Sequence, residues 1–237
     1  MLWEWPNSGK QVFILDIDGT LMPSAKVDNE CFWQAVFDCF GERATLPDLH
    51  GYTHVTDSGI LNEWCHHELG RSPGTEETRQ IRQRFLDLLK AASNRQPEYF
   101  LPLPGVRSWL EAVQAKDNIY AGIATGGWEH SARLKLGLAG LDRFNLPLAS
   151  SDDATPRAEI MQIAAQRTLN CRPVDEIVFT YVGDGSWDLQ ASQKLDWRFI
   201  GIASGERAKQ LRQAGATHIQ ADFYRTRQNQ CKRELTV

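Results

Sequence analysis

Apolar positions along the chain follow two different periods. A short β-branched run at residues 12–18 ends in acidic residues and predicts a buried strand. Between residues 26 and 95 the apolar positions recur with helical spacing, which predicts helices and no strand. Prolines and a glycine interrupt this pattern at residues 101–105, and both periods alternate beyond them. The chain therefore divides into a first strand, a helical block and a mixed region.

The mixed region predicts a parallel sheet. Strands are expected at residues 118–125, 146–151, 177–184, 198–204 and 217–221, and helices at 106–113, 130–140 and 156–169. Thr155 is expected to be the N-cap of the last of these helices, with Pro156 at its first position. Strands that alternate with helices through short connections form a parallel sheet covered on both faces. The predicted fold class is α/β, with a Rossmann-like three-layer core.

The helical block interrupts this core directly after its first strand. We therefore expect an inserted all-helical cap domain at residues 24–100, and an α/β core domain formed by residues 1–23 and 101–237. Ligands of open parallel sheets bind outside the carboxyl ends of the strands. Both connections of the cap lie near that edge, so the cap should cover the site.

Composition narrows the classes of function. The 237 residues include 26 basic and 30 acidic side chains, and a net charge of −4 leaves no basic excess for a nucleic acid. No apolar run approaches the ~18 residues that span a bilayer, and the first residues lack a signal-peptide pattern. The five cysteines include no CxxC pair, which favours inert thiols. We expect a cytoplasmic protein without nucleic-acid or membrane partners; the sequence does not determine its oligomeric state.

Carboxylates gather at the ends of two predicted strands. Asp16 and Asp18 end the first strand, where alternation would put them on one side, and Asp184 and Asp188 follow the strand at 177–184. Each alone could be a helix cap or a turn former. Four acids in one place repel each other unless a cation lies among them, and oxygen-only ligands favour a hard ion. The pattern predicts a Mg²⁺ site.

The residues around these acids suit a phosphate group. Gly19 and Thr20 follow the first acid pair, and Thr125 and Gly126 follow the next strand. Glycines let backbone N–H groups approach an anion, and a threonine hydroxyl can donate to a phosphoryl oxygen. Arg157 lies in the first turn of its predicted helix, where the helix dipole disfavours a cation unless an anionic partner is present. These residues are candidate phosphate ligands.

At this point the sequence resembles the haloacid dehalogenase-like hydrolases. The resemblance extends over essentially the whole chain and depends on four motifs in the family's order, which are DIDGTL (16–21), IATGG (123–127), Arg157 and VGDGSWD (182–188). The dehalogenating branch has an aromatic residue where this chain has Asp18, so the resemblance implies phosphoryl transfer. The third motif is more often Lys followed by Pro, and here Arg157 precedes Ala158. The cap has lysines only near its ends, Lys26 and Lys90, which disfavours phosphonate cleavage through an imine.

The resemblance also implies a role for each motif residue. Asp16 would attack phosphorus and become an aspartyl-phosphate, while Asp18 would protonate the leaving group and then activate water. The implied metal ligands are the Asp16 carboxylate, the Asp18 backbone carbonyl and Asp184. Asp188 would not bind the metal directly but would orient its water ligands or Arg157. The residues implied to hold the phosphoryl oxygens are Thr125, Gly126 and Arg157.

Two cap residues have alternative interpretations. Thr56 and Asp57 precede a helical run, in a segment similar to one that faces substrate in the family. Either residue could instead be the N-cap of the helix. Trp128, directly after the second motif, could line the mouth of the site or pack in a core.

The resulting hypothesis is a Mg²⁺-dependent phosphatase for a small phosphorylated metabolite, similar to phosphoglycolate phosphatases. One alternative is a phosphomutase of the β-phosphoglucomutase type, which passes the phosphoryl group to a sugar inside a cap that excludes water. A more remote alternative is a non-catalytic module that binds a phosphorylated ligand. The sequence does not identify the leaving group.

Overall fold

A six-stranded parallel sheet forms the centre of the computed structural model, which describes residues 9–41, 49–170 and 176–224. Its strands lie in the order β3-β2-β1-β4-β5-β6. Their bounds are β1 (Lys10–Leu15), β2 (Ile119–Ala124), β3 (Leu148–Ala149), β4 (Ile177–Gly183), β5 (Arg198–Ile202) and β6 (Ile219–Gln220). The order reverses on the two sides of β1, which creates a switch point at the carboxyl ends of β1 and β4, where ligands of such sheets bind.

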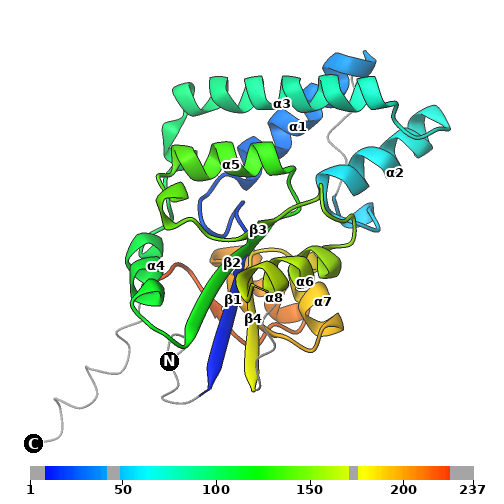
Figure 1. Ribbon diagram of the computed structural model, residues 1–237. Coiled ribbons are helices and arrows are strands. Elements are labelled where there is room, and N and C mark those ends of the chain that lie inside the picture. The colour runs from blue at the N-terminus through cyan, green and yellow to red at the C-terminus, as the bar shows by residue number, and fades with distance from the viewer. Residues whose placement is uncertain (1–8, 42–48, 171–175, 225–237) are drawn as a thin grey trace, which may run out of the picture.

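Helices cover both faces of the sheet, as the sequence predicts (Figure 1). Side chains of β1 alternate between the faces: Phe13 and Leu15 join one apolar cluster, and Val12 and Ile14 join the other. The first cluster includes residues of α4 (Val106–Gln114) and α5 (Glu129–Leu138). The second includes residues of α6 (Arg157–Thr168), α7 (Ser186–Lys194) and α8 (Gly205–Gln213). This gives the expected three layers.

Three of the four helices between β1 and β2 form a separate layer at the carboxyl ends of the strands, which we call the cap (Figure 1). They are α1 (Ala25–Phe40), α2 (Asp57–Leu69) and α3 (Thr75–Arg95); a 3₁₀ turn at Leu49–Gly51 precedes α2, and another at Pro97–Phe100 follows α3. An aromatic core holds them together, with Trp33, Trp64 and Phe85 almost fully buried. Trp128 of the sheet domain is part of the same core, so the two parts share a hydrophobic interface.

Two local expectations are wrong. The helix α6 begins at Arg157 with Pro156 as its N-cap, rather than at Pro156 with Thr155 as the cap. Pro156 adopts extended backbone angles and has no N–H to donate, so it fits the position before the helix. The strand β1 ends at Leu15, so Asp16 and Asp18 lie in a loop. Strand alternation therefore does not govern their side chains.

The structure also describes three of the five cysteines and bears on the question of membrane-spanning helices. Cys31, Cys39 and Cys65 are free thiols, while Cys171 and Cys231 lie outside the described residues. Within the described ranges, no helix combines the length and the apolar content that crossing a membrane requires.

Candidate active site

Three of the four predicted acids meet at the switch point of the sheet. Asp16 and Asp184 directly follow β1 and β4, which pair in register with Leu15 opposite Val182. Asp188 lies in the first turn of α7. Each of the three acids offers an oxygen within 4.8 Å of the others, and all three are buried. We call Asp16, Asp184 and Asp188 the strand-end cluster.

Backbone hydrogen bonds and burial act in opposite directions on the pKa values of this cluster. The Asp188 carboxylate accepts hydrogen bonds from the backbone N–H of Asp184 at 3.1 Å and of Gly185 at 3.0 Å. Burial raises the pKa of Asp188 despite the nearby Arg157. The pKa of Asp16 lies well above its usual range, first because the group is buried and then because Asp188 repels its charge. The negative charges of these acids therefore disfavour one another in the absence of a compensating cation.

Arg157 is the buried cation of this site. Its Nη1 atom lies 3.1 Å from Asp188 Oδ1 and 3.4 Å from Asp16 Oδ1. Its Nη2 atom donates to the Val55 carbonyl of the cap at 2.8 Å. A side chain at Gly126 would place Cβ only 2.3 Å from Nη2, so glycine is needed there. Burial opposes the charge of Arg157, but Asp188 and then Tyr181 and Asp16 hold its pKa above the usual value.

The remaining predicted phosphate ligands surround the same point. Gly19 has a backbone φ of +81°, and a Cβ there would lie 2.0 Å from Asp184 Oδ2. The hydroxyl of Thr20 is buried without a hydrogen-bond partner among the described residues. Thr125, also buried, accepts a hydrogen bond from the Gly127 N–H at 3.1 Å. An unpartnered buried hydroxyl beside the acid loop is consistent with a ligand that the protein binds there.

Asp18 has different partners from the other three acids. Its Oδ1 atom accepts a 2.5 Å hydrogen bond from the Ser24 hydroxyl, and its Oδ2 atom pairs with Lys135 Nζ. The same Nζ lies 2.6 Å from Asp28 Oδ1. The carboxylate of Asp18 is therefore not part of the strand-end cluster, although its negative charge contributes to the raised pKa of Asp16.

Sequence reasoning missed Lys135 and Asp28. Lys135 lies on α5 and is fully buried, and Asp28 lies in the first turn of α1. A signal was present, because helical spacing puts Lys135 on the same face as the buried residues Ser131 and Ala132. A lysine in an apolar stripe of a helix indicates a buried ion pair or a functional site.

Thr56 and Asp57 join the cap to the sheet domain. Thr56 is the N-cap of α2, because its hydroxyl accepts the Gly59 N–H at 3.3 Å, and the same hydroxyl donates to the Thr155 carbonyl. Asp57 Oδ2 accepts the Trp128 N–H at 2.9 Å, and its own N–H donates to the Gly126 carbonyl. The N-cap prediction is confirmed for Thr56. Both side chains are occupied at the interface between the cap and the sheet domain.

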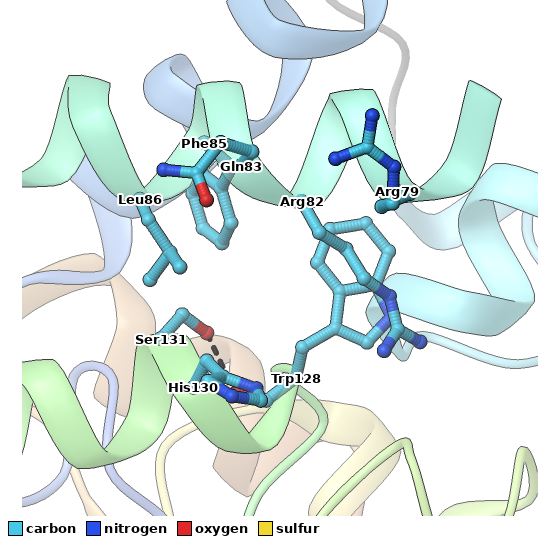
Figure 2. A pocket seen from close by; sticks show the side chains of 8 residues that line it. All are labelled: Arg79, Arg82, Gln83, Phe85, Leu86, Trp128, His130 and Ser131. Carbon is cyan, nitrogen blue, oxygen red and sulfur yellow. Dashed lines mark hydrogen bonds between the residues drawn. The ribbon is translucent and has the colours of Figure 1, made fainter. Parts of the chain in front are cut away.

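Trp128 packs in the cap instead of lining the acid cluster. Its indole N–H donates to the Ser58 hydroxyl at 2.9 Å, and the guanidinium of Arg82 lies over the ring at 4.8 Å from its centre. A cavity of about 200 Å³ lies beside the ring between α3 and α5 (Figure 2). None of the four motif acids lines this cavity. Trp128 therefore belongs to the aromatic core that the cap shares with the sheet domain, apart from the strand-end cluster.

Comparison with known proteins gives a family match and several structural neighbours. A model of haloacid dehalogenase-like hydrolases matches residues 13–202. No curated protein sequence matches the chain. A hydrolase from Pseudomonas syringae is similar in structure with a TM-score of 0.67 and 22% identity, over 91% of this chain and 94% of that one.

Two further neighbours have lower identity. CbbY from Rhodobacter sphaeroides, solved with phosphate, has a TM-score of 0.64 at 18% identity, over 91% of this chain and 95% of that one. A candidate β-phosphoglucomutase from Bacteroides vulgatus has the same TM-score and identity, over 91% and 85%. At these identities the neighbours establish the fold alone. The family model spans all four motifs and most of the chain, and the protein therefore belongs to the haloacid dehalogenase-like hydrolases.

Proposed function

We propose that the protein is a Mg²⁺-dependent phosphatase that hydrolyses a small phosphorylated metabolite through an aspartyl-phosphate at Asp16. The observation that supports this most directly is the strand-end cluster with Arg157 in contact with two of its members. A nucleophilic carboxylate beside a fixed guanidinium is the arrangement that phosphoryl transfer requires, because positioning and charge stabilisation supply most of its catalysis. Burial of the site keeps bulk water from weakening these interactions.

The donor set of the cluster fits Mg²⁺. It consists of carboxylate oxygens, with the Asp18 backbone carbonyl as a further candidate, and contains no sulfur or imidazole ligand. Arg207 of α8 pairs with Asp184, so a bound ion would share this carboxylate with the guanidinium or displace it. We infer that Asp16 and Asp184 would hold the ion and that Asp188 would keep Asp184 and Arg157 in place. A bound ion would neutralise these acids and draw charge from a phosphoryl oxygen.

The loops around the cluster would hold the phosphoryl group. Arg157, the Thr125 hydroxyl and the Gly126 N–H would contact its oxygens, and the N–H and hydroxyl groups of Gly19 and Thr20 would complete the cradle. Because Thr20 has a buried hydroxyl without a partner, binding a phosphate would satisfy it. This arrangement would orient phosphorus toward the Asp16 carboxylate.

Asp16 and Asp18 would divide the chemistry between them. An Asp16 oxygen would form a bond to phosphorus as the bond to the leaving oxygen breaks, and Asp18 would give that oxygen a proton. Asp18, now a carboxylate, would then take a proton from a water molecule that attacks the aspartyl-phosphate. Inorganic phosphate would leave, with both aspartates restored. We further propose that residues 24–100 form the cap and select the leaving group, since the Val55–Asp57 turn contacts Arg157 and the Thr125 loop.

Closure of the cap favours a phosphomutase as the second candidate. Asp16 is only 5% exposed, and a hydrogen-bonded interface joins the cap turn to the sheet domain. A closed site would allow the phosphoryl group to pass to a sugar hydroxyl instead of water. Activation by a sugar bisphosphate, with isomerised sugar phosphate as the product, would distinguish this activity from hydrolysis.

The test of the proposed function is a screen of phosphorylated metabolites for release of inorganic phosphate. We expect at least one small ester to be hydrolysed in the presence of Mg²⁺, and we expect Asp16→Asn to lower the rate by roughly a thousandfold or more. Asp117→Asn, an exposed change of the same chemistry in the sheet domain, is the matched control and should keep the wild-type rate. Hydrolysis by Asp16→Asn at the rate of the control would contradict the proposal.

A further inference from the structure

Lys135 is a fully buried lysine whose charge is compensated from two different parts of the chain. Its Nζ atom pairs with Asp18 Oδ2 in the loop after β1 and with Asp28 Oδ1 of α1 at 2.6 Å. Burial alone would lower the pKa of Lys135, but Asp18 and Asp28 together hold it above its usual value. The side chain is therefore a fixed positive charge, out of reach of solvent and of any ligand.

Each oxygen of the Asp18 carboxylate has one partner among the described residues, which leaves acceptor capacity on both. Ser24 donates to Oδ1 at 2.5 Å, and Lys135 pairs with Oδ2. A carboxylate held at both oxygens has a defined orientation, whereas a carboxylate in an open loop samples several rotamers. The two partners come from different elements, Ser24 from the start of the cap segment and Lys135 from α5.

The ion pair with Asp28 connects Lys135 to the cap. Asp28 lies in the first turn of α1, whose later residues Phe32 and Trp33 pack in the core of the cap. Lys135 therefore joins a cap helix to the loop of Asp18. If the cap moves relative to the sheet domain, Lys135 loses one of its two carboxylates, and the geometry at Asp18 changes with it.

We propose that Lys135 is a positioning residue that orients the Asp18 carboxylate and couples its orientation to the seating of the cap through Asp28. This inference deepens the proposed function and rests on it, because it concerns the acid and base of that reaction. The competing explanation is a buried ion pair that serves folding alone. Buried pairs often contribute little net stability, and removal of one partner is destabilising in either case, so stability does not separate the two explanations.

A double-mutant cycle on the ester found by the screen separates them. Lys135→Met keeps a long unbranched side chain and removes the charge. We expect it to lower kcat/KM by roughly tenfold to a hundredfold, a part of the effect that a general acid supplies. In an Asp18→Asn background the same change should alter kcat/KM by less than about twofold, because the group on which Lys135 acts is absent. Arg133→Met, an exposed change on α5, should have no effect.

If Lys135→Met does not fold, the variant Asp28→Asn tests the same role of Lys135. Asp28→Asn leaves the contact between Lys135 and Asp18 in place and weakens only the tie to the cap. It should lower kcat/KM several-fold, and this loss should also vanish in the Asp18→Asn background. Thermal unfolding of each variant reports whether it is folded at the assay temperature.

The possible outcomes separate this inference from the proposed function. Equal losses in both backgrounds, or no loss in the wild-type background, would overturn the role of Lys135 while the phosphatase activity stands. Wild-type activity in Asp18→Asn, or in the Asp16→Asn enzyme, would instead overturn the proposed mechanism, and the role of Lys135 with it.

Discussion

Two groups of buried charges lie at the carboxyl end of the sheet, and they are built in different ways. The strand-end cluster combines Asp16, Asp184 and Asp188 with Arg157, all from the sheet domain. The second group, which we call the junction cluster, combines Asp18, Asp28 and Asp57 with Lys135. Its members come from a core loop, from α5 and from the cap helices α1 and α2. The three acids of the first cluster all lie in the sheet domain, and the cap contacts this group through the Val55 carbonyl, which accepts a hydrogen bond from Arg157. In the second cluster two of the three acids, Asp28 and Asp57, lie in cap helices.

The two clusters also differ in how their negative charge is compensated. In the strand-end cluster the carboxylates lie close together, and this is the group of acids among the described residues whose oxygens converge as metal ligands do. In the junction cluster the ammonium group of Lys135 lies between Asp18 and Asp28 and takes the place that an ion would need. In the proposed mechanism the first cluster binds the cation and the phosphate, and the second holds the general acid in position.

A large effect of pH on stability is expected from Asp28 of the junction cluster. Burial, and then the charge of Asp18, raises the pKa of Asp28 to about 6, although Lys135 opposes this shift; Asp57 also faces this group. A raised pKa means that the folded state binds the proton more tightly than the unfolded state does. The stabilisation is complete below the unfolded pKa near 4 and is lost as the pH rises through about 6.

The free energy of unfolding of the metal-free protein should therefore fall between about pH 4 and 7, with Asp28 contributing up to about 3 kcal/mol. Urea unfolding at a series of pH values measures this. Asp28→Asn should have a flatter profile than the wild type, and Asp117→Asn should not. Identical profiles for the wild type and Asp28→Asn would show that Asp28 titrates normally.

The next effect concerns the strand-end cluster. A ligand at a hundredfold its dissociation constant stabilises the folded state by about 2.7 kcal/mol. Mg²⁺ should raise the unfolding temperature of the wild type, and EDTA should reverse the change. Asp184→Asn should lose this gain, while Asp28→Asn should keep it, because only the first change removes a proposed metal ligand. A gain of the same size in both variants would place the ion elsewhere.

The two clusters were not equally predictable from the sequence. Asp16 and Asp184 follow apolar strand segments, and strands of a parallel sheet end at one edge, so local patterns bring these acids together. Arg157 is predicted from its match to the third family motif; the helix dipole supports this assignment, but by itself it would leave an ordinary surface arginine as the simpler explanation. The sheet, the helices α4, α5 and α6 and the helical block after β1 follow from periodicity, with strand ends misplaced by a few residues. The helices α7 and α8 were not predicted from the sequence.

The junction cluster depends on contacts that no local pattern encodes. Lys135 lies 117 residues from Asp18 and 107 from Asp28, and neither pairing follows from the period of a helix or strand. The direction of the Asp18 side chain also depends on where β1 ends, which tertiary packing decides. The position of Trp128 in the core of the cap is a result of the same kind.

The most direct test of the account is to find the phosphoryl group on the protein during turnover. The wild-type enzyme is mixed with a hydrolysed ester and Mg²⁺, quenched in acid within the first turnover, and digested for mass spectrometry. Cleavage after Lys10 and Lys26 yields a peptide that contains Asp16 and Asp18. We predict a phosphoryl adduct that fragmentation assigns to Asp16 and that Asp16→Asn lacks. Phosphate release without an adduct, or an adduct on another residue, would contradict the account.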